Sequence, residues 1–232
     1  MTADTVAIVP AYNEAPRIAR VLQVILSSPR VTHIVVVDDG STDQTGEVTK
    51  GFPVSLLQWE QNKGKGAALQ AGLDHVRDAR RYLFLDADLV NLRHEHMEAL
   101  LAPLEDPAVA MAIGVFRAGS KGHVNLAQRY FSILNGQRAL SREFVEMLPD
   151  LSWSRFGVEI LLTRFARLAQ QKVVYPELEG ITHVTKEEKL GIARGFSYRL
   201  QMYRECLYSL FFHKKMIRVH PGKIPEDFLQ TL

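Results

Sequence analysis

Two carboxylates separated by one residue, in Asp86-Ala87-Asp88, are the side chains of this sequence best spaced for metal chemistry. They follow an apolar run, residues 82–85, that has the character of a buried strand. In an extended chain, residues i and i+2 point to the same side, so both carboxylates can share a hard cation. Mg²⁺ or Mn²⁺ suits such a site and usually completes its coordination with substrate phosphates and water. A solvated strand end with a helix cap is the alternative for this motif taken alone.

A second acidic pair, Asp38 and Asp39, opens the segment Asp-Asp-Gly-Ser-Thr-Asp, again directly after an apolar run. A turn at Gly40 and a helix cap at Asp43 account for part of this segment. They leave the two adjacent carboxylates unexplained, because like charges at a strand end repel each other unless something compensates. A turn and a ligand-binding site are therefore both open interpretations.

Two further polar motifs follow apolar runs. Residues 10–14 read Pro-Ala-Tyr-Asn-Glu, and residues 62–66 read Asn-Lys-Gly-Lys-Gly and lead into a helical pattern. The glycines of the second motif let the backbone approach a ligand, and its lysines and the helix N-terminus supply positive potential, which favours phosphate. The spacing differs from that of the phosphate-binding loop of nucleoside triphosphatases, and a plain glycine-rich turn is the alternative.

Short apolar runs alternate with segments of helical period in the first half of the chain, which is typical of βαβ units around a parallel sheet. The sequence predicts strands at residues 5–9, 33–37, 54–58 and 82–85. It predicts a helix along Ile18, Val21, Leu22 and Ile25, a helix at 44–50 with Asp43 as N-cap, and a helix after Gly66 along Leu69, Leu73 and Val76. Ligands bind outside the carboxyl ends of strands in such sheets, so one edge would gather the four polar motifs.

Beyond Asp88 the pattern is less regular. It predicts a helix at 93–101, a strand at 110–116, a flexible loop at 119–122, a helix from Val158 to Leu168, a strand at 172–175 and an amphipathic stretch at 192–212. Between residues 189 and 223 there are eight Lys or Arg and one acid, Glu205. An amphipathic helix on an anionic bilayer and a helix packed on the domain both fit this basic segment.

The bulk composition indicates one globular domain. The 232 residues are 47% hydrophobic and 23% charged, and no linker divides them. A net charge of +2 is too small to indicate a nucleic-acid partner. A single cysteine, Cys206, excludes an intramolecular disulfide and favours a reducing compartment. The N-terminus has no signal-peptide pattern and the apolar stretch 207–212 is too short to span a bilayer, so we expect a cytoplasmic protein.

Taken together, the four motifs resemble those of the nucleotide-sugar glycosyltransferases of family 2, especially the branch similar to dolichol-phosphate mannosyltransferases. They occur in the family's order and approximate spacing, and the resemblance covers residues 6–88 closely and 135–191 loosely. It implies an α/β fold of GT-A type, with a Rossmann-like, mostly parallel sheet flanked by helices in a single domain, 1–232. The expected parts are a nucleotide-sugar-binding half (1–120), an acceptor half (121–191) and a basic amphipathic C-terminal segment (192–232).

The resemblance also implies roles for individual residues. It places the nucleoside among Pro10, Tyr12, Glu14 and Asp39. It places the donor near Lys63 and Lys65. It places the ribose, the diphosphate and a Mg²⁺ or Mn²⁺ ion at Asp86, Ala87 and Asp88. Of these residues, Asp88 is expected to be the main metal ligand and a catalytic residue.

In the second half, Gly-Gln-Arg-Ala at 136–139 resembles the acceptor-side turn of the family, and the segment Phe-Gly-Val-Glu that ends at Glu159 resembles its continuation. Glu159 would then face the reacting centre as a catalytic residue; the alternative is a carboxylate that only favours the dipole of a helix N-terminus. His183 lies where some relatives supply a further metal or diphosphate contact, and a hydrogen-bonded structural histidine is the alternative. Lys186 and Lys189 are candidates to contact phosphate.

The activity that the resemblance implies is transfer of a sugar from a UDP- or GDP-sugar, with inversion, while the cation neutralises charge on the leaving diphosphate. A hydroxyl acceptor needs Glu159 as general base, whereas an anionic lipid phosphate needs none. Polyprenyl phosphate and other cell-envelope or glycan acceptors fit, and a lipid acceptor implies peripheral contact with the inner face of an anionic membrane. The alternatives are a sugar-1-phosphate nucleotidyltransferase, whose glycine- and arginine-rich loop is absent, and a catalytically silent nucleotide-sugar binding module.

Overall fold

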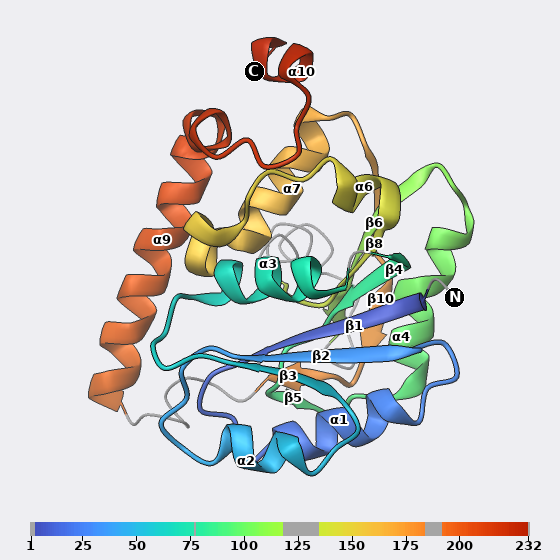
Figure 1. Ribbon diagram of the computed structural model, residues 1–232, viewed down its shortest axis with the longest axis vertical. Helices are drawn as coiled ribbons and strands as arrows, with labels where there is room; N and C mark the ends of the chain where they lie inside the picture. The colour runs from blue at the N-terminus through green and yellow to red at the C-terminus, as the bar shows by residue number, and fades with distance from the viewer. Residues whose placement is uncertain (1–2, 77, 118–134, 184–191, 232) are drawn as a thin grey trace.

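The computed structural model describes residues 3–76, 78–117, 135–183 and 192–231 of the chain. Its centre is a seven-stranded sheet with helices on both faces (Figure 1). The strand order is β3-β2-β1-β4-β8-β6-β9. Strand β8 is antiparallel to both of its neighbours, and the other neighbouring pairs are parallel. The predicted α/β fold with a mostly parallel sheet is therefore confirmed.

All four strands predicted in the first half form. Their bounds are Ala3–Ala11 for β1, His33–Asp38 for β2, Ser55–Gln58 for β3 and Ala79–Phe84 for β4. These four strands are adjacent and parallel, so their carboxyl ends lie at the same edge of the sheet. The polar motifs that follow them therefore share this edge.

The helices of the first half also follow the prediction, with shifts at their ends. They are α1 (Ile18–Leu26), α2 (Thr45–Lys50), α3 (Lys65–His75) and α4 (His94–Leu101), followed by the 3-10 turn η1 (Ala102–Glu105). The N-cap position of α2 is Gln44, one residue after the predicted Asp43, and the side chain of Gln44 makes no capping hydrogen bond. The carboxylate of Asp43 accepts the hydrogen bond from the N–H of Thr45 at 2.9 Å, so Asp43 still binds a free N–H of the first turn, as predicted.

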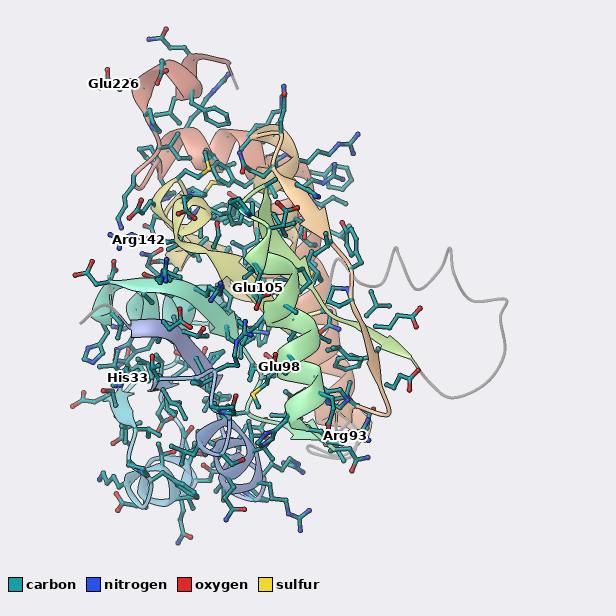
Figure 2. All side chains as sticks on the ribbon, turned by 90° about the vertical axis from the view of Figure 1, so that its right-hand side faces the viewer. His33, Arg93, Glu98, Glu105, Arg142 and Glu226 are labelled. Atoms are coloured by element: carbon teal, nitrogen blue, oxygen red, sulfur yellow. The ribbon has the colours of Figure 1, made fainter. Side chains whose placement is uncertain are left out.

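The core is divided by the sheet into two layers, because successive side chains of a strand point to opposite faces. In β1, Val6 and Ile8 face the layer that includes α3 and α7, whereas Ala7 and Val9 face the layer that includes α1 and α4. In the second layer, Arg30 lies 3.5 Å from Glu98 of α4 and 3.0 Å from Glu105 of η1, both labelled in Figure 2. These ion pairs connect the end of α1 to the α4 side of the molecule.

The predicted strand at 110–116 is two strands, β6 (Val109–Ile113) and β7 (Val115–Arg117). The break falls at Gly114, whose N–H donates to the carbonyl of Gln137 at 2.9 Å. A Cβ at this position would lie 2.4 Å from the side chain of Leu178. Beyond the break, β7 leaves the main sheet and pairs with β10 (Glu177–Glu179).

Strand β8 (Arg138–Ser141) was not predicted, and the expectation of a turn at 136–139 is wrong. Ala139 pairs with Leu83 of β4 on one side and with Ala112 of β6 on the other. Four residues carry too little pattern to show a strand, and the position of β8 depends on neighbours that are distant in the sequence.

The remaining elements complete the sheet and the layers around it; α6, α7, α9 and α10 are labelled in Figure 1. They are β5 (Leu89–Val90), α6 (Arg142–Glu146), η3 (Ser152–Gly157), α7 (Val158–Leu168), β9 (Lys172–Val174), β11 (Thr182–His183), α9 (Ile192–Val219) and α10 (Glu226–Thr231). The helix predicted from Val158 and the strand predicted at 172–175 are confirmed, and α9 continues beyond the predicted residue 212. The loop at 119–122, Lys186 and Lys189 lie outside the described residues. In the described part of the chain, no helix has the length and apolar character needed to cross a bilayer.

Candidate active site

The turn after β1 is held against the turn after β2. Asn13 adopts a positive φ of 56°, and its side-chain oxygen accepts hydrogen bonds from the N–H groups of Thr42 at 2.8 Å and Asp43 at 3.3 Å. In return, the N–H of Asn13 donates to the hydroxyl of Ser41 at 2.9 Å, and that of Glu14 donates to the hydroxyl of Thr45 at 2.8 Å. These bonds fix two of the four polar motifs relative to each other.

The adjacent acids Asp38 and Asp39 have different partners. Asp38 accepts hydrogen bonds from the N–H of Ser41 at 3.0 Å and from the side chain of Gln58 at 3.2 Å. Asp39 accepts from the backbone N–H groups of Lys63 at 2.6 Å and Gly64 at 2.9 Å. Burial raises the pKa of Asp39, and the two backbone hydrogen bonds oppose this rise. The compensation expected for two neighbouring carboxylates thus comes from hydrogen-bond donors of the protein.

The loop before α3 therefore binds Asp39 through its backbone. Gly64 has a φ of 97°, which a residue with a side chain rarely adopts, and a Cβ there would lie 3.1 Å from atoms of Arg155. The side chain of Lys63 is exposed and places its ammonium 4.4 Å from the centre of the Trp59 ring. The two lysines of this motif are therefore used differently, because the side chain of Lys65 points inward.

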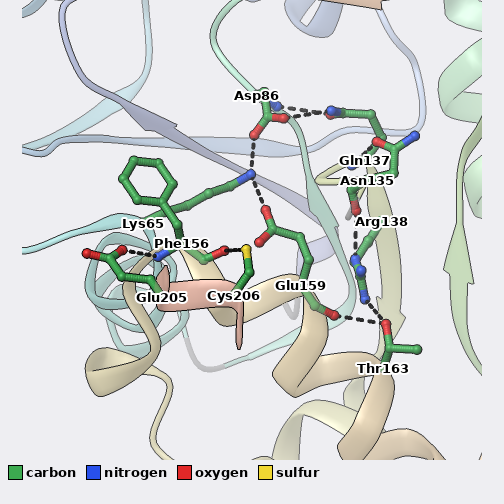
Figure 3. A network of polar contacts seen from close by, with 10 residues as sticks. All are labelled: Lys65, Asp86, Asn135, Gln137, Arg138, Phe156, Glu159, Thr163, Glu205 and Cys206. Atoms are coloured by element: carbon green, nitrogen blue, oxygen red, sulfur yellow. Dashed lines mark hydrogen bonds and ion pairs between the residues drawn. The ribbon is translucent and has the colours of Figure 1, made fainter. Parts of the chain in front are cut away.

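Lys65 lies between two carboxylates from distant parts of the chain (Figure 3). Its Nζ is 2.5 Å from Oδ1 of Asp86, directly after β4, and 2.6 Å from Oε1 of Glu159, in the first turn of α7. The exposed fractions of these three side chains are only 16%, 19% and 9%. Burial alone would lower the pKa of Lys65, but the two carboxylates more than offset it and hold the pKa above its ordinary value. The lysine is therefore a cation whose single positive charge is shared by both acids.

The second oxygen of Asp86 is held by Gln137. Nε2 of Gln137 donates to Oδ2 of Asp86 at 2.8 Å, and the N–H of Asp86 donates to Oε1 of Gln137 at 3.0 Å. Gly136, the residue before Gln137, leaves room for Lys65, Asp86 and Glu159, which we call the ion cluster. A Cβ at position 136 would lie 2.5 Å from Nζ of Lys65. The segment 136–139, expected as an acceptor-side turn, therefore orients Asp86 from the neighbouring strand.

A buried arginine lies on the other side of Gln137 (Figure 3). Arg138 is 1% exposed and donates to the carbonyl of Asn135 and to the hydroxyl of Thr163, both at 2.9 Å. Burial lowers its pKa to about 10, although the nearby Glu159 and Asp86 favour its charged form. The acids of the site thus face two buried cations.

The other residues predicted to bind the nucleoside lie around the same edge. Pro10 is near the end of β1, in register with Val37 of β2, and Tyr12 is 37% exposed just beyond it. Glu14 is 6% exposed, and its carboxylate lies 3.3 Å from the guanidinium of Arg17. The structure thus brings together the motifs after β1, β2 and β3, and it brings the motif after β4 together with Glu159.

The residues predicted to hold a metal ion follow β4. Ala87 is buried and Asp88 is half-buried, and β5 begins at the next residue, Leu89. Strand β11 pairs antiparallel with β5. His183 is therefore in register with Leu89, the residue that follows Asp88. Among the side chains that the structure describes, no three His, Cys, Asp or Glu form a group that could hold a metal. Carboxylate ligands nevertheless suit Mg²⁺ or Mn²⁺ when phosphate oxygens and water complete the coordination.

The sequence placed Gln137 and Arg138 only in an acceptor-side turn and gave them no contact with the site, and it did not single out Arg155. Arg155 has a φ of 48° and donates to the carbonyl of Lys63 and to the side chain of Asn62, both at 3.5 Å. Gln137 lies 51 positions from its partner Asp86, and Arg155 lies 93 positions from its partner Asn62. Nothing in the local sequence connects these residues to their partners. Only their contacts show that they support the site.

Residues 6–158 match the family model described as Glycosyl transferase family 2, and this match covers more than half of the chain. The chain belongs to glycosyl transferase family 2. The family assignment favours a glycosyltransferase over the nucleotidyltransferase and the silent binding module that the motifs alone left open.

Curated relatives support the same assignment. A dolichyl-phosphate beta-glucosyltransferase of Trichomonas vaginalis is 42% identical over 95 residues, which cover 35% of this chain and 29% of that protein. A 4,4'-diaponeurosporenoate glycosyltransferase of Staphylococcus aureus is 31% identical over 99 residues, covering 40% of this chain and 26% of that protein. The chain thus matches less than a third of the length of these relatives. The first of them is named a glucosyltransferase, so the similarity is not specific to mannosyltransferases.

A solved structure shows the same fold over most of the chain. Glucosyl-3-phosphoglycerate synthase of Mycobacterium tuberculosis, in complex with Mn²⁺, UDP and glucosyl-3-phosphoglycerate, matches with a TM-score of 0.72 and 25% identity. The match covers 91% of this chain and 80% of that protein. The chain therefore has the GT-A-type fold expected from its motifs.

Proposed function

We propose that this glycosyltransferase transfers a hexosyl group from a UDP- or GDP-sugar to a phosphate-bearing lipid such as polyprenyl phosphate, with inversion at the anomeric carbon. The observation that carries the proposal is the position of Lys65, which joins Asp86 beside the donor motifs to Glu159 at the start of α7. The name of the dolichyl-phosphate beta-glucosyltransferase supports a lipid phosphate acceptor. We infer that residues 1–120 bind the nucleotide sugar and residues 121–191 bind the acceptor.

The donor would bind at the shared edge of β1 to β4. We assign Pro10, Tyr12, Glu14 and Asp39 to the nucleoside, and Lys63, Lys65 and Ala87 to the rest of the donor. Asp39 supports this assignment indirectly, since it fixes the backbone of the loop that carries both lysines. Of the two lysines, Lys63 has the exposed side chain, so it is free to approach a phosphate by leaving the Trp59 ring.

We assign the divalent ion, Mg²⁺ or Mn²⁺, mainly to Asp88, with Asp86 and His183 as further ligands. When bound, such an ion stabilises the negative charge that develops on the departing diphosphate. We assign the larger share of the coordination to Asp88, as the family resemblance implies. To Asp86, whose carboxylate is held by Lys65 and Gln137, we assign the orientation of this strand end.

The acceptor decides the role of Glu159. A hydroxyl acceptor must lose a proton, and a carboxylate would take it. Glu159 is instead engaged with the ammonium of Lys65 at 2.6 Å, so it would first have to release this cation. A lipid phosphate is already anionic and attacks without a base. The ion pair therefore supports a phosphate acceptor, with Glu159 positioning Lys65. A lipid phosphate acceptor would in turn place the reaction in the cytoplasm, at the inner face of a membrane.

A calorimetric screen tests the donor site. UDP-, GDP- and dTDP-sugars are titrated into the protein with and without Mn²⁺, and the titration is repeated on Asp88→Ala and on Asp227→Ala, whose side chain is exposed on α10. We expect metal-dependent binding of one nucleotide sugar, weakened at least about tenfold by Asp88→Ala, because even residues that only support metal ligands contribute this much. Asp227→Ala should bind normally. Absence of metal-dependent binding in the unaltered protein would show that the proposal is wrong.

A further inference from the structure

Helix α9 carries most of the large apolar side chains that the described part of the chain exposes to solvent. Five of the seven lie on it: Leu207, Tyr208, Phe211, Phe212 and Val219. Phe211 is 72% exposed, and the rings of Tyr208 and Phe212 pack together with centres 5.0 Å apart. Apolar side chains concentrated in this way are typical of an interaction surface rather than of ordinary solvent exposure.

These residues share one side of the helix. At 3.6 residues per turn, positions 207, 208, 211, 212 and 219 fall within less than half of the circumference. Four exposed cations fall on the same side: Arg204, Lys214, Lys215 and Arg218. We call these nine residues the α9 face.

The opposite side of α9 is buried in the molecule. Cys206, Ser209 and Ile217 are at most 9% exposed. Glu205, the only acid between residues 204 and 219, also points to this side, because it binds Nε of Arg155 at 3.1 Å and the N–H of Phe156 at 3.3 Å. The α9 face therefore combines aromatic and aliphatic side chains with positive charge and contains no negative charge.

This composition distinguishes between possible occupants. A second copy of the chain, packed through the same face, would bring four cations against four cations, and none of the nine residues of the face is an acid, which is unfavourable. An anionic bilayer offers phosphate groups to the cations and an acyl boundary to the aromatic rings, and interfacial helices have this combination. Charge complementarity thus favours a lipid surface.

We propose that the α9 face docks the enzyme on an anionic bilayer. The helix would lie flat, with the rings of Phe211 and Phe212 at the acyl boundary and Lys215 and Arg218 among the headgroups. Arg155 connects this helix to the donor loop, since it binds Glu205 of α9 and the carbonyl of Lys63. In Figure 1, α9 runs along the left edge of the molecule, beside the turn that precedes α7. The purpose of this docking, to bring the site to a lipid acceptor, rests on the proposed function, but the docking itself does not.

Co-sedimentation of the full chain with vesicles tests the docking without any nucleotide sugar. The vesicles contain phosphatidylcholine alone or phosphatidylcholine with phosphatidylglycerol. We expect binding to the anionic vesicles that falls as salt is added, and much weaker binding to the neutral ones.

Two pairs of substitutions separate the apolar and the charged contributions. Replacing Phe211 and Phe212 with Ser should weaken binding at least about tenfold, since each buried phenylalanine contributes this much. Lys215→Glu with Arg218→Glu should weaken it about tenfold or more, because each cation near an anionic surface contributes about fivefold. The matched controls are Leu26→Ser, which replaces an exposed leucine at the end of α1, and Lys50→Glu on α2, and both should bind as the unaltered protein does.

Three outcomes would overturn the proposal. One is no binding to either vesicle by a protein that still binds nucleotide sugar in calorimetry, which would leave the proposed function standing. Another is sedimentation velocity showing a dimer that Phe211→Ser dissociates, which would assign the face to a second copy. The third is vesicle binding that survives both pairs of substitutions in variants whose circular dichroism and melting temperature are unchanged. That result would place the lipid contact elsewhere on the chain.

Discussion

Nζ of Lys65 lies 2.6 Å from Oε1 of Glu159, although 94 positions separate the two residues. The same nitrogen lies 2.5 Å from Oδ1 of Asp86. One ammonium group thus connects the helix that follows the donor loop, the end of β4 and the start of α7. Any movement of one of these segments changes the environment of the other two.

Replacement of Lys65 by Met should destabilise the protein. It removes the cation and leaves two largely buried carboxylates facing each other, and loss of one partner from a buried ion pair costs about 3–5 kcal/mol. The pKa of Lys65 is raised in the folded state. Its contribution to the free energy of unfolding is therefore fully present below the ordinary lysine pKa, and it is lost as the pH rises from there through the raised pKa of the folded state. Urea unfolding at neutral pH measures the difference. Lys50→Met removes an exposed lysine paired with Glu47 and should cost no more than about 1 kcal/mol; equal effects of the two would contradict this account.

A methyl group at position 136 should disrupt the ion cluster. In Gly136→Ala the added Cβ would lie 2.5 Å from Nζ of Lys65 and 2.6 Å from Oδ2 of Asp86, so the cluster must shift. Overpacking of this kind costs about 1–3 kcal/mol. Thermal unfolding and calorimetric titration with nucleotide sugar test this. The melting temperature and the affinity should both fall. Gly51→Ala at the end of α2 has an ordinary φ of −74° and should leave the affinity unchanged.

Glu159→Gln separates the two classes of acceptor. With polyprenyl phosphate, kcat/KM should fall by less than about tenfold, because the nucleophile needs no base. With a hydroxyl acceptor, loss of a general base should reduce the rate by about 10²–10⁴. The measurement is transfer of labelled sugar to each acceptor, with Glu143→Gln on the exposed side of α6 as the control. A fall of the larger size with polyprenyl phosphate would make Glu159 a base and remove the argument for a phosphate nucleophile.

Cys206 should be protected in the folded protein. Its side chain packs where α9 meets η3, with Sγ donating to the carbonyl of Phe156 at 3.6 Å, and burial raises its pKa to about 11. The unfolded thiol ionises near its ordinary pKa of about 8.5. Stability should therefore fall as the pH rises between these two values, since the unfolded state loses its proton first. Labelling with a thiol reagent should be far slower in buffer than in urea, and the pH dependence should be smaller in Cys206→Ala. Rapid labelling of the folded chain would show that α9 separates readily from the domain.

The sequence was sufficient for the first half of the sheet and for the edge at which the site lies. Strands such as β1 and β2 are continuous apolar runs because both of their faces are buried, and helix α1 shows its buried stripe at helical spacing. These are local patterns, so they can be read without knowing the neighbours. The acidic and glycine-rich motifs follow the strands directly, and parallel strands necessarily carry them to one edge.

The tertiary structure decided the features that depend on residues distant in sequence. Strand β8 exists because β4 and β6 offer hydrogen bonds on both sides, and its four residues show little periodicity of their own. The break at Gly114 depends on the side chain of Leu178. The local sequence shows that Asp39 and Glu159 are acids. It does not show that backbone N–H groups bind Asp39 or that Lys65 binds Glu159. Apolar periodicity records which residues are buried, whereas the partner of a buried charge is chosen by how the elements pack, and this information is not present in any single segment.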